Sequence, residues 1–258
     1  MALGRLIGRR RRHGPRPLSG SCTTVLLDAF GTLVTLDAPA PLLRALLAER
    51  LGVQVTEAQA GEALAGEVSY YRSHMHEGID MERVARLHAR CAEVLRAALP
   101  ADPALTAAQP GLMTEVLLET LRFKVFDEVP QALERLRASG LRLVVASNWD
   151  ASLDTMLDRV GLLALVDGVV NSAAAGYAKP DPRLLQSALL LAGADASSAV
   201  HVGDGFREDV GAAFGAGVRP VLLSRDGRAG EVEYGDDEPL LPELLVIRSL
   251  AELPALLV

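Results

Sequence analysis

The amino-acid sequence predicts an α/β fold: a doubly wound, Rossmann-like parallel sheet with an inserted all-helical cap domain. Three observations support this prediction. From about residue 123 onward, short apolar runs alternate with helical patterns that end in glycine, and repeated βα units imply right-handed crossovers and one parallel sheet. The apolar runs are continuous, as expected for strands that are covered on both faces. Residues 39–122, in contrast, show only helical spacing.

The predicted elements begin with a short strand at 24–27, which stops at Asp28. A long segment follows in which apolar residues recur at helical spacing and no strand pattern interrupts them. These residues are Leu42, Leu43, Leu46, Leu47, Leu51, Val84, Leu87, Cys91, Val94 and Leu95. We therefore predict an α/β core formed by residues 23–37 and 123–258, with a helical cap formed by residues 38–122.

The second part of the chain is predicted to alternate between helices and strands. Gly140 follows the first of these helices, at the place of a C-terminal glycine cap. In order, we predict a helix at 129–139, a strand at 141–146, a helix at 150–160, a strand at 168–170, a helix at 182–192, a strand at 199–202, a helix at 206–216, a strand at 219–223, and a last strand and helix within 244–257.

The composition is typical of an acidic enzyme rather than of a nucleic-acid or membrane protein. The net charge is −7, whereas phosphate backbones require clustered Lys and Arg. No apolar run approaches the ~20 residues that a membrane span needs. Cys22 and Cys91 lie far apart and in no ligand spacing, so we expect neither a disulfide nor a zinc site, and we expect a cytoplasmic location. The expected partner is a small-molecule substrate, and the oligomeric state stays open between monomer and homodimer.

The N-terminus differs from the rest of the chain. Residues 1–20 contain six Arg and no acidic residue. Pro15, Pro17, Ser19 and Gly20 follow the arginine run at 9–12, where a secretory signal would have an apolar segment. We predict that residues 1–22 are a basic, disordered extension. A misplaced start codon would explain the same composition, and a targeting role or an anionic partner is the alternative.

Polar residues cluster where the predicted strands or their connections end: Asp28, Ser147, Asn148, Lys179, Asp204 and Asp209. In doubly wound sheets, ligands bind beyond the carboxyl ends of the strands. We therefore expect these side chains to lie together at one edge of the sheet and to form the chemical site.

The carboxylates suggest a nucleophile and a metal site. The side chain of Asp28 can attack an electrophile and form a covalent ester or acyl-phosphate, although an Asp before Gly31 is also a common turn former. Asp204 and Asp209 supply oxygen ligands of the kind that Mg²⁺ prefers. The alternative for this pair is a helix N-cap with an acidic first turn.

The remaining polar residues suggest an anion site. Lys179 could pair with the carboxylates and with a substrate anion, or it could be a solvated loop residue. The Ser147 hydroxyl, the Asn148 amide and the N–H groups of the next helix can cradle an anion, or they can simply cap that helix. The histidines show no partner spacing and are expected to be solvated or packed. Tyr70, Tyr71 and Arg72 could face the site, but core packing is the preferred interpretation.

These motifs, in this order, resemble those of the haloacid dehalogenase-like (HAD) hydrolase superfamily. The first motif is DAFGTL at Asp28–Leu33, the second is Ser147, the third is Lys179 and the fourth is GDGFRED at Gly203–Asp209. The resemblance covers the α/β portion, and the helical segment looks like the C1 cap of that superfamily. Such caps close over the site and set substrate choice. The segments SNWD and AKPDP look like those of one poorly characterised branch.

The resemblance implies a set of roles for residues of this chain. Asp28 would be the nucleophile, with Lys179 and Asp209 completing the catalytic set. Mg²⁺ would be the cofactor, and its ligands would be the carboxylates of Asp28 and Asp204 and the main-chain carbonyl of Phe30. The residues implied for phosphate or substrate binding are Thr32, Ser147, Asn148 and Lys179.

Two positions argue for different branches of the superfamily. Its phosphatases usually carry a second Asp, the general acid/base, where this chain has Phe30, and such catalysis typically contributes ~10²–10⁴-fold. An aromatic residue there and Ser147-Asn148 look like the 2-haloacid dehalogenases, in which the asparagine helps to bind the halide. Asp204 argues the other way, since those dehalogenases have serine there and use no metal.

Without a cation, Asp204 would repel Asp28, so we give Asp204 more weight than Phe30. The favoured hypothesis is a Mg²⁺-dependent phosphatase that acts on a small phosphorylated metabolite through an aspartyl-phosphate. To work without the second Asp, such an enzyme would use Asp150 or Glu208 as the proton donor, act on a substrate with a good leaving group, or be slow. The alternatives are a metal-independent 2-haloacid dehalogenase and a catalytically weak binding protein of the same fold.

Overall fold

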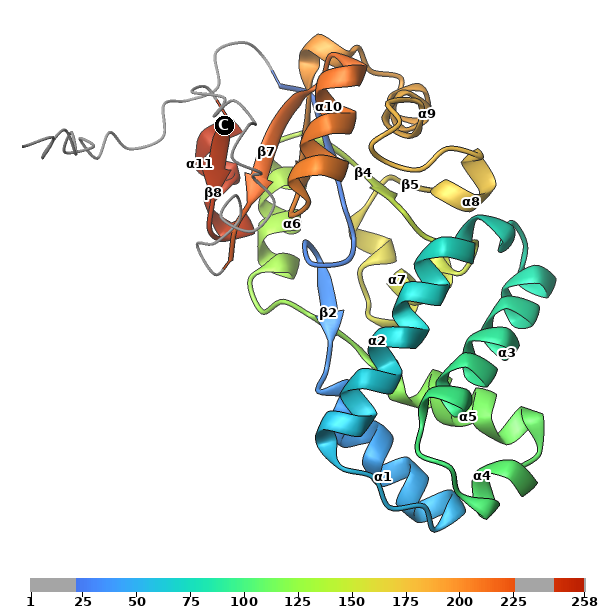
Figure 1. Cartoon of the computed structure of the whole chain (residues 1–258). Helices are drawn as coiled ribbons and strands as arrows, with labels where there is room; N and C mark the ends of the chain where they lie inside the picture. Colours follow the sequence, from blue (N-terminus) through green and yellow to red (C-terminus); the bar gives the residue numbers. More distant parts are fainter. Residues whose placement is uncertain (1–21, 226–243, 258) are drawn as a thin grey trace, which may run out of the picture.

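The computed structural model of the chain describes residues 22–225 and 244–257 (Figure 1). The predicted basic extension therefore lies outside the described residues, except for Cys22. The described part contains a six-stranded parallel sheet in the order β5-β4-β1-β6-β7-β8. The strands are β1 (Thr24–Leu27), β4 (Arg142–Ser147), β5 (Gly168–Asn171), β6 (Ala199–Gly203), β7 (Arg219–Leu223) and β8 (Leu245–Ile247). The predicted α/β fold and parallel sheet are confirmed.

The sheet is doubly wound around β1. From β1 the chain moves outward through β4 and β5, and it then crosses to the other side of β1, where it forms β6, β7 and β8. Leu27, the last residue of β1, lies opposite Val145 of β4 and Val202 of β6. Because all three strands are parallel and in this register, their carboxyl ends lie at the same edge of the sheet.

Alternate residues of the strands enter two different cores. On one face, Val25 and Leu27 pack against α6 (Val129–Ala138) and α7 (Leu153–Arg159), together with the C-terminal turns η5 (Leu250–Glu252) and α11 (Pro254–Leu257). On the other face, Leu26 packs against α9 (Arg183–Ala192) and α10 (Gly211–Ala216). Successive side chains of a strand point to opposite faces, so the continuous apolar runs reflect burial on both sides.

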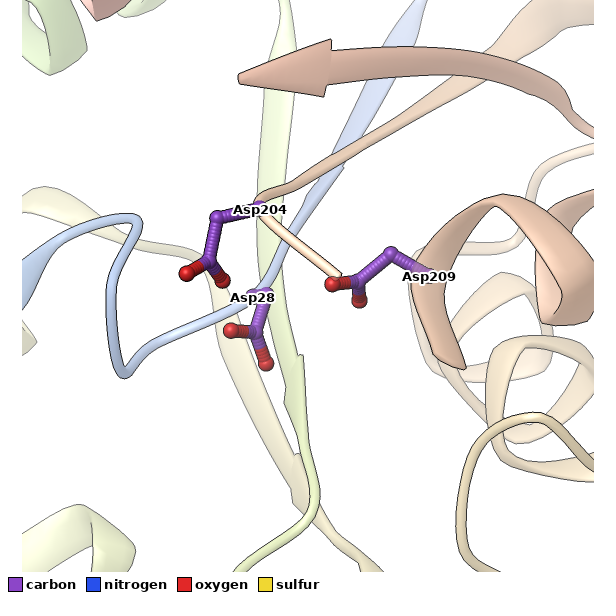
Figure 2. A group of neighbouring side chains, drawn as sticks. All are labelled: Asp28, Asp204 and Asp209. Carbon is purple, nitrogen blue, oxygen red and sulfur yellow. The ribbon is translucent and has the colours of Figure 1, made fainter. Parts of the chain in front are cut away.

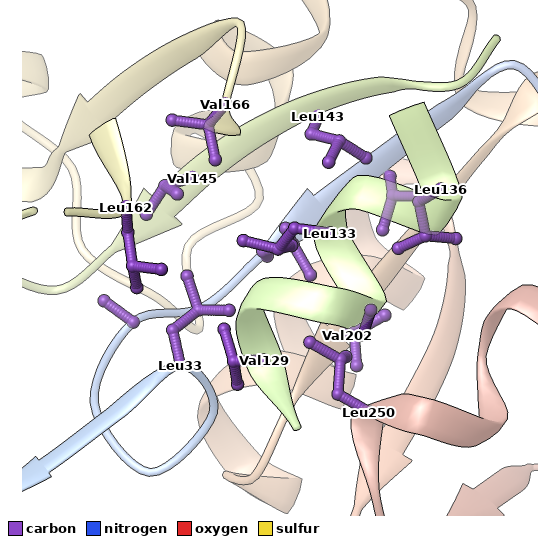
Figure 3. Packing of buried hydrophobic residues seen from close by; sticks show 14 of the residues in the cluster. Leu33, Val129, Leu133, Leu136, Leu143, Val145, Leu162, Val166, Val202 and Leu250 are labelled. Atoms are coloured by element: carbon purple, nitrogen blue, oxygen red, sulfur yellow. The ribbon is translucent and has the colours of Figure 1, made fainter. Parts of the chain in front are cut away.

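Figure 3 shows the first of these cores, in which Leu133 of α6 lies among strand and helix residues. Leu133 is fully buried, whereas Leu190 of α9 is 85% exposed. We expect Leu133→Ala to lower the free energy of unfolding by about 2–5 kcal/mol, because it removes buried apolar surface and leaves a cavity. Urea-induced unfolding measures this change, with Leu190→Ala as the matched control. A Leu133 variant as stable as the Leu190 variant would contradict the packing described.

Residues between β2 (Val34–Leu36) and β3 (Phe123–Val125) form the helical insert, as the sequence predicts. Its helices have a hydrophobic core of their own. Thr56 and Gln59 form a capping box at the start of α2, and Asp80 caps α3, which fixes where both helices begin. The elements are α1 (Pro39–Leu51), α2 (Glu57–His74), the 3₁₀ turn η1 (Met75–Glu77), α3 (Met81–Ala98), α4 (Pro103–Ala107) and α5 (Pro110–Thr120).

The strands β2 and β3 form an antiparallel pair that the sequence analysis missed. Leu36 lies opposite Phe123, so the two connections between the sheet and the insert run side by side. Each strand has only three residues, which is too short for a periodic pattern to be recognised. The boundaries of a separate cap domain at 38–122 stay a prediction.

The insert contacts the sheet part at the loop after β4. The backbone N–H of Ala151 donates to the carbonyl of Gly78, at 2.8 Å. A Cβ atom at Gly78 would lie 2.7 Å from the Cβ of Asp150, so only glycine allows this approach without displacement. The insert therefore lies on the side of the sheet where β4 ends (Figure 1).

Two predicted helices differ from the observed ones in detail. The helix predicted from Asp150 begins at Leu153, because Asp150 accepts hydrogen bonds from Ser152 in a preceding turn. The helix predicted at 206–216 opens with a π-helical turn, η4 (Phe206–Val210), before α10. The short helix α8 (Ser172–Ala175) and the 3₁₀ turns η2 (Leu163–Leu165) and η3 (Ala196–Ser198) were not predicted. Among the described residues, none of the helices combines the length and the apolar character that crossing a bilayer requires.

Candidate active site

Three carboxylates meet at the carboxyl edge of the sheet (Figure 2). Asp28 follows β1, Asp204 follows β6, and Asp209 lies in the π-helical turn after β6. One oxygen from each lies within 4.8 Å of the others. The register of β1 and β6 causes this arrangement, since Asp28 and Asp204 extend neighbouring parallel strands.

Lys179 neutralises two of these carboxylates. Its Nζ donates to Oδ1 of Asp28 at 2.5 Å and to Oδ1 of Asp209 at 2.6 Å, and all three residues are buried. Burial alone would lower the pKa of Lys179, but the charges of Asp209 and Asp28 outweigh it and raise the pKa above its usual value. The predicted pairing of Lys179 with the carboxylates is therefore present in the structure.

Asp28 has a second donor in Ser147, whose Oγ lies 2.9 Å from the same Oδ1. In the described residues, no hydrogen bond reaches the other oxygen, Oδ2, which is left for a reaction or for a cation. Burial raises the pKa of Asp28, and Asp209 adds to this effect, whereas Lys179 and Ser147 oppose it without cancelling it. In the absence of a cation, the site disfavours a charged Asp28.

Asn148 fixes the backbone of Lys179. Its Oδ1 accepts from the Lys179 N–H at 2.7 Å, and its Nδ2 donates to the Lys179 carbonyl at 2.9 Å. Asn148 was predicted to bind substrate, and in the structure both polar atoms of its amide position the lysine that follows β5 and α8. A contact with substrate through its remaining N–H stays a prediction.

Two glycines make room for the carboxylates. A Cβ at Gly31, which has a φ of +84°, would lie 2.0 Å from Oδ2 of Asp204. A Cβ at Gly203 would lie 2.1 Å from Cγ of Asp209. Any other residue at either position would displace a carboxylate, so both glycines are required by the close approach of side chain to backbone.

Asp204 is the most accessible of the three carboxylates, and Figure 2 shows its carboxyl group turned toward Asp28. Partial burial of this group and the negative charges of Asp28 and Asp209 raise the pKa of Asp204 to about 7. This is the consequence of placing like charges together. A bound divalent cation would reverse the shift, because the ion is then the largest local charge.

The donor set fits Mg²⁺. Hard divalent cations take carboxylate and carbonyl oxygens and usually need only one or two carboxylates from the protein. Asp28 and Asp204 supply two, and no described residue donates a hydrogen bond to the Phe30 carbonyl. The side chain of Phe30 is 38% exposed, so the ring occupies the predicted position of the usual second Asp without being packed into the core.

The turn that carries Phe30 is held by a residue that the sequence analysis missed. Nη2 of Arg225 donates to the Thr32 carbonyl at 2.6 Å, and Nε donates to the Gly31 carbonyl at 3.3 Å. Arg225 also pairs with Glu128. Thr32, a predicted phosphate ligand, is fully buried, and its hydroxyl has no partner among the described residues.

Asp150 was considered as a substitute proton donor, but its surroundings are unfavourable for that role. It is fully buried and accepts from Tyr71 of α2 at 3.1 Å and from the Ser152 hydroxyl at 2.5 Å, with Nε2 of His88 at 3.7 Å. Burial opposes ionisation, but His88 and Ser152 outweigh it and lower the pKa of Asp150. An ionised carboxylate cannot donate a proton, so this side chain instead joins the insert to the sheet.

Of the other residues named by the sequence analysis, some pack in the insert and some lie close to the site. Tyr70 stacks on His74 with ring centroids 4.0 Å apart, and both tyrosines pack against the core of the insert, as preferred. Glu208 lies beside Gly205 and is half-buried. Among the histidines, His201 is buried in β6 and contacts Asp209 through Nε2 at 2.9 Å. A single histidine inside an apolar run was the only signal of this contact.

Comparison with known proteins agrees with the geometry. A family model described as haloacid dehalogenase-like hydrolase matches residues 22–217. Haloacid dehalogenase-like hydrolase domain-containing protein 3 of Danio rerio is 34% identical over 60% of this chain and 61% of its own length. A phosphoglycolate phosphatase of Caulobacter vibrioides is 32% identical over 58% of this chain and 63% of its own length. The chain thus spans less than two thirds of these relatives.

A solved structure is also similar. A 2-haloacid dehalogenase from Pseudomonas syringae pv. Tomato DC3000 matches with a TM-score of 0.61 and 27% identity, over 92% of this chain and 98% of that one. The predicted superfamily is confirmed, and the relative from Danio rerio belongs to the branch that SNWD and AKPDP suggested.

Proposed function

Because this chain belongs to the haloacid dehalogenase-like hydrolase family, we propose that it is a Mg²⁺-dependent phosphatase of a small phosphorylated metabolite. The observation that carries the proposal is Asp204. Its carboxyl group adds a negative charge beside Asp28 and Asp209, an arrangement that is unfavourable without a cation and suitable with one. Relatives named as phosphoglycolate phosphatases support a phosphate ester as substrate.

In the proposed reaction, Oδ2 of Asp28 attacks phosphorus, because Ser147 and Lys179 both donate to Oδ1. The bond from phosphorus to the alcohol oxygen breaks, and an aspartyl-phosphate forms. Water then attacks the phosphorus of this acyl-phosphate, the bond to the Asp28 oxygen breaks, and inorganic phosphate and the free carboxylate are released. Asp28, Asp204 and the Phe30 carbonyl would hold Mg²⁺, which would supply positive charge to offset the carboxylates and the phosphoryl group.

Other residues are proposed to bind the phosphoryl group. The Lys179 ammonium and the Ser147 hydroxyl already converge on Asp28, so they are positioned to donate to phosphoryl oxygens. Thr32 and Asn148 are proposed to complete this anion site. Asp209 holds Lys179 in place, and the helical insert is proposed to act as the cap that selects the metabolite. A cytoplasmic location is part of the same proposal.

The test is a panel of small phosphate esters, assayed for phosphate release with Mg²⁺ and with EDTA. Release that requires Mg²⁺ supports the proposal. No release from any ester, with Mg²⁺ binding retained, would favour a catalytically weak binding protein instead.

A second candidate is metal-independent dehalogenation, for which Phe30 and the similarity to a 2-haloacid dehalogenase are the specific observations. In this reaction Asp28 attacks the carbon that bears the halogen, the halide departs, and water hydrolyses the ester. Chloride released from 2-chloropropionate in the presence of EDTA would establish this activity.

Phe30→Asp is expected to increase phosphatase activity toward esters with poor leaving groups. The new carboxyl group can protonate the departing alcohol, and general acid catalysis typically contributes about 10²–10⁴-fold. We expect an increase in kcat of about 10-fold, which is below that range because the site is not tuned for the new acid. Steady-state assays on an alkyl phosphate and on p-nitrophenyl phosphate measure it, since only the first needs an acid.

Phe30→Asn is the matched control, because it has the same size as the Asp variant without an acid. The side chain of residue 30 is partly exposed, so neither variant is expected to unfold. Equal activities of the two variants toward the alkyl phosphate would show that no proton donor is missing at this position.

A further inference from the structure

The buried histidine of β6 is engaged by the same carboxylate that holds Lys179. Nε2 of His201 lies 2.9 Å from Oδ1 of Asp209, and Nζ of Lys179 lies 2.6 Å from that same oxygen. His201 is 1% exposed. A chain of contacts therefore runs from His201 through Asp209 and Lys179 to Asp28.

The geometry of β6 explains why a histidine is found there. Residues 201 and 203 lie on the same face of the strand, because side chains alternate. Asp209 lies over this face, where Gly203 leaves space for its carboxyl group. His201 reaches the same carboxyl group from two residues earlier in the strand.

The hydrogen bond has a defined direction. Asp209 is ionised, because Lys179 and His201 outweigh the effect of its burial and lower the pKa of its carboxyl group. An ionised carboxylate only accepts, so Nε2 of His201 must carry the proton. Nδ1, at the other side of the ring, is buried without a partner in the described residues, so the ring is anchored through Nε2.

We propose that His201 is a positioning residue, which orients the Asp209 carboxylate and thereby fixes the Lys179 ammonium group between Asp209 and Asp28. Oδ2 of Asp209 accepts from the Gly205 N–H at 2.9 Å. With His201 on Oδ1, the carboxylate is held at both oxygens and cannot rotate. Without His201, only Lys179 itself contacts Oδ1 of Asp209. The position of that oxygen, and with it the position of the Lys179 ammonium group, is then less well fixed.

The chain contains two lysines, Lys179 and the exposed Lys124, which makes a direct test possible. In protein labelled with ¹⁵N-lysine, His201→Leu is expected to shift the side-chain resonance of Lys179 and to leave that of Lys124 unchanged. His201→Gln keeps a donor at a similar reach, so its Lys179 resonance is expected to stay at the wild-type position. His88→Leu is the matched control, because it makes the same replacement at a histidine that does not contact Asp209 or Lys179. It is expected to leave the Lys179 resonance unchanged.

The kinetic consequence rests on the proposed function. If the chain is a phosphatase, His201→Leu lowers kcat by about 10-fold, the factor expected for one lost hydrogen bond to a charged group. His201→Gln retains activity within about 3-fold. If the wild type hydrolyses no ester, the proposed function fails, and the lysine resonances still decide whether His201 positions Lys179.

Two results would overturn the inference. One concerns the lysine resonances: either a folded His201→Leu protein keeps the Lys179 resonance at its wild-type position, or His201→Gln shifts that resonance as much as His201→Leu does. The other needs no variant: in wild-type protein labelled with ¹⁵N-histidine, a His201 whose Nε2 carries no proton could not donate to Asp209. This second measurement remains decisive even if the leucine variant does not fold.

Discussion

Asp28→Asn is expected to abolish phosphate release, with a fall in kcat of about 10⁴-fold or more, as for other enzymes that lose their nucleophile. The amide cannot form the covalent acyl-phosphate, and the substitution also removes one carboxylate from the proposed Mg²⁺ site. Folding is expected to persist. The amide oxygen of asparagine can still accept the hydrogen bonds from Lys179 and Ser147, and Lys179 keeps its ion pair with Asp209.

The measurement combines phosphate release with thermal unfolding, and Asp154→Asn is the control. Asp154 is exposed on α7, so the same chemical change there is expected to alter neither activity nor stability. Hydrolysis that survives Asp28→Asn at the wild-type rate would mean that another group is the nucleophile. Loss of activity together with unfolding would not support a catalytic role, and for this reason both quantities are needed.

Lys179→Met is expected to lower the free energy of unfolding by about 3–5 kcal/mol, the range found when one partner of a buried ion pair is removed. Asp28 and Asp209 both lose their buried counter-charge, and they lie close to each other and to Asp204. Phosphatase activity is expected to disappear as well, since no ammonium group remains to bind the phosphoryl oxygens. Denaturant unfolding measures the first effect and phosphate release the second.

The other lysine provides the control. Lys124 is exposed on β3, and Lys124→Met is expected to change stability by no more than about 0.5 kcal/mol. Adding Asp209→Asn to Lys179→Met should restore part of the lost stability, because it removes one of the unpaired carboxylates. If Lys179→Met is as stable as Lys124→Met, the carboxylates of Asp28 and Asp209 do not need the Lys179 ammonium group as a counter-charge.

The order of the strands along the chain and the location of the site were predictable from the sequence. Continuous apolar runs mark strands that are buried on both faces, and Asp28, Ser147 and Asp204 follow such runs directly. The register of the sheet was not predictable, because it depends on packing between strands far apart in sequence. That register is what places Asp28 beside Asp204.

Features that depend on tertiary contacts were missed. The contact of Tyr71, from the insert, with the Asp150 carboxylate joins residues far apart in the sequence, and no local pattern indicates it. Arg225, which follows β7, contacts the turn after β1, and His201 of β6 contacts Asp209; neither has a spacing relative to Asp28 that a motif could reveal.

The antiparallel pair of β2 and β3 makes the helical insert a replaceable module. The chain leaves the sheet part through Val34–Leu36 and returns through Phe123–Val125, with Leu36 directly opposite Phe123. A two-residue hairpin turn can join strands in that arrangement. An insert of different length can therefore be joined to the sheet part at Leu36 and Phe123, while the strand order and the carboxylates of the sheet stay as they are.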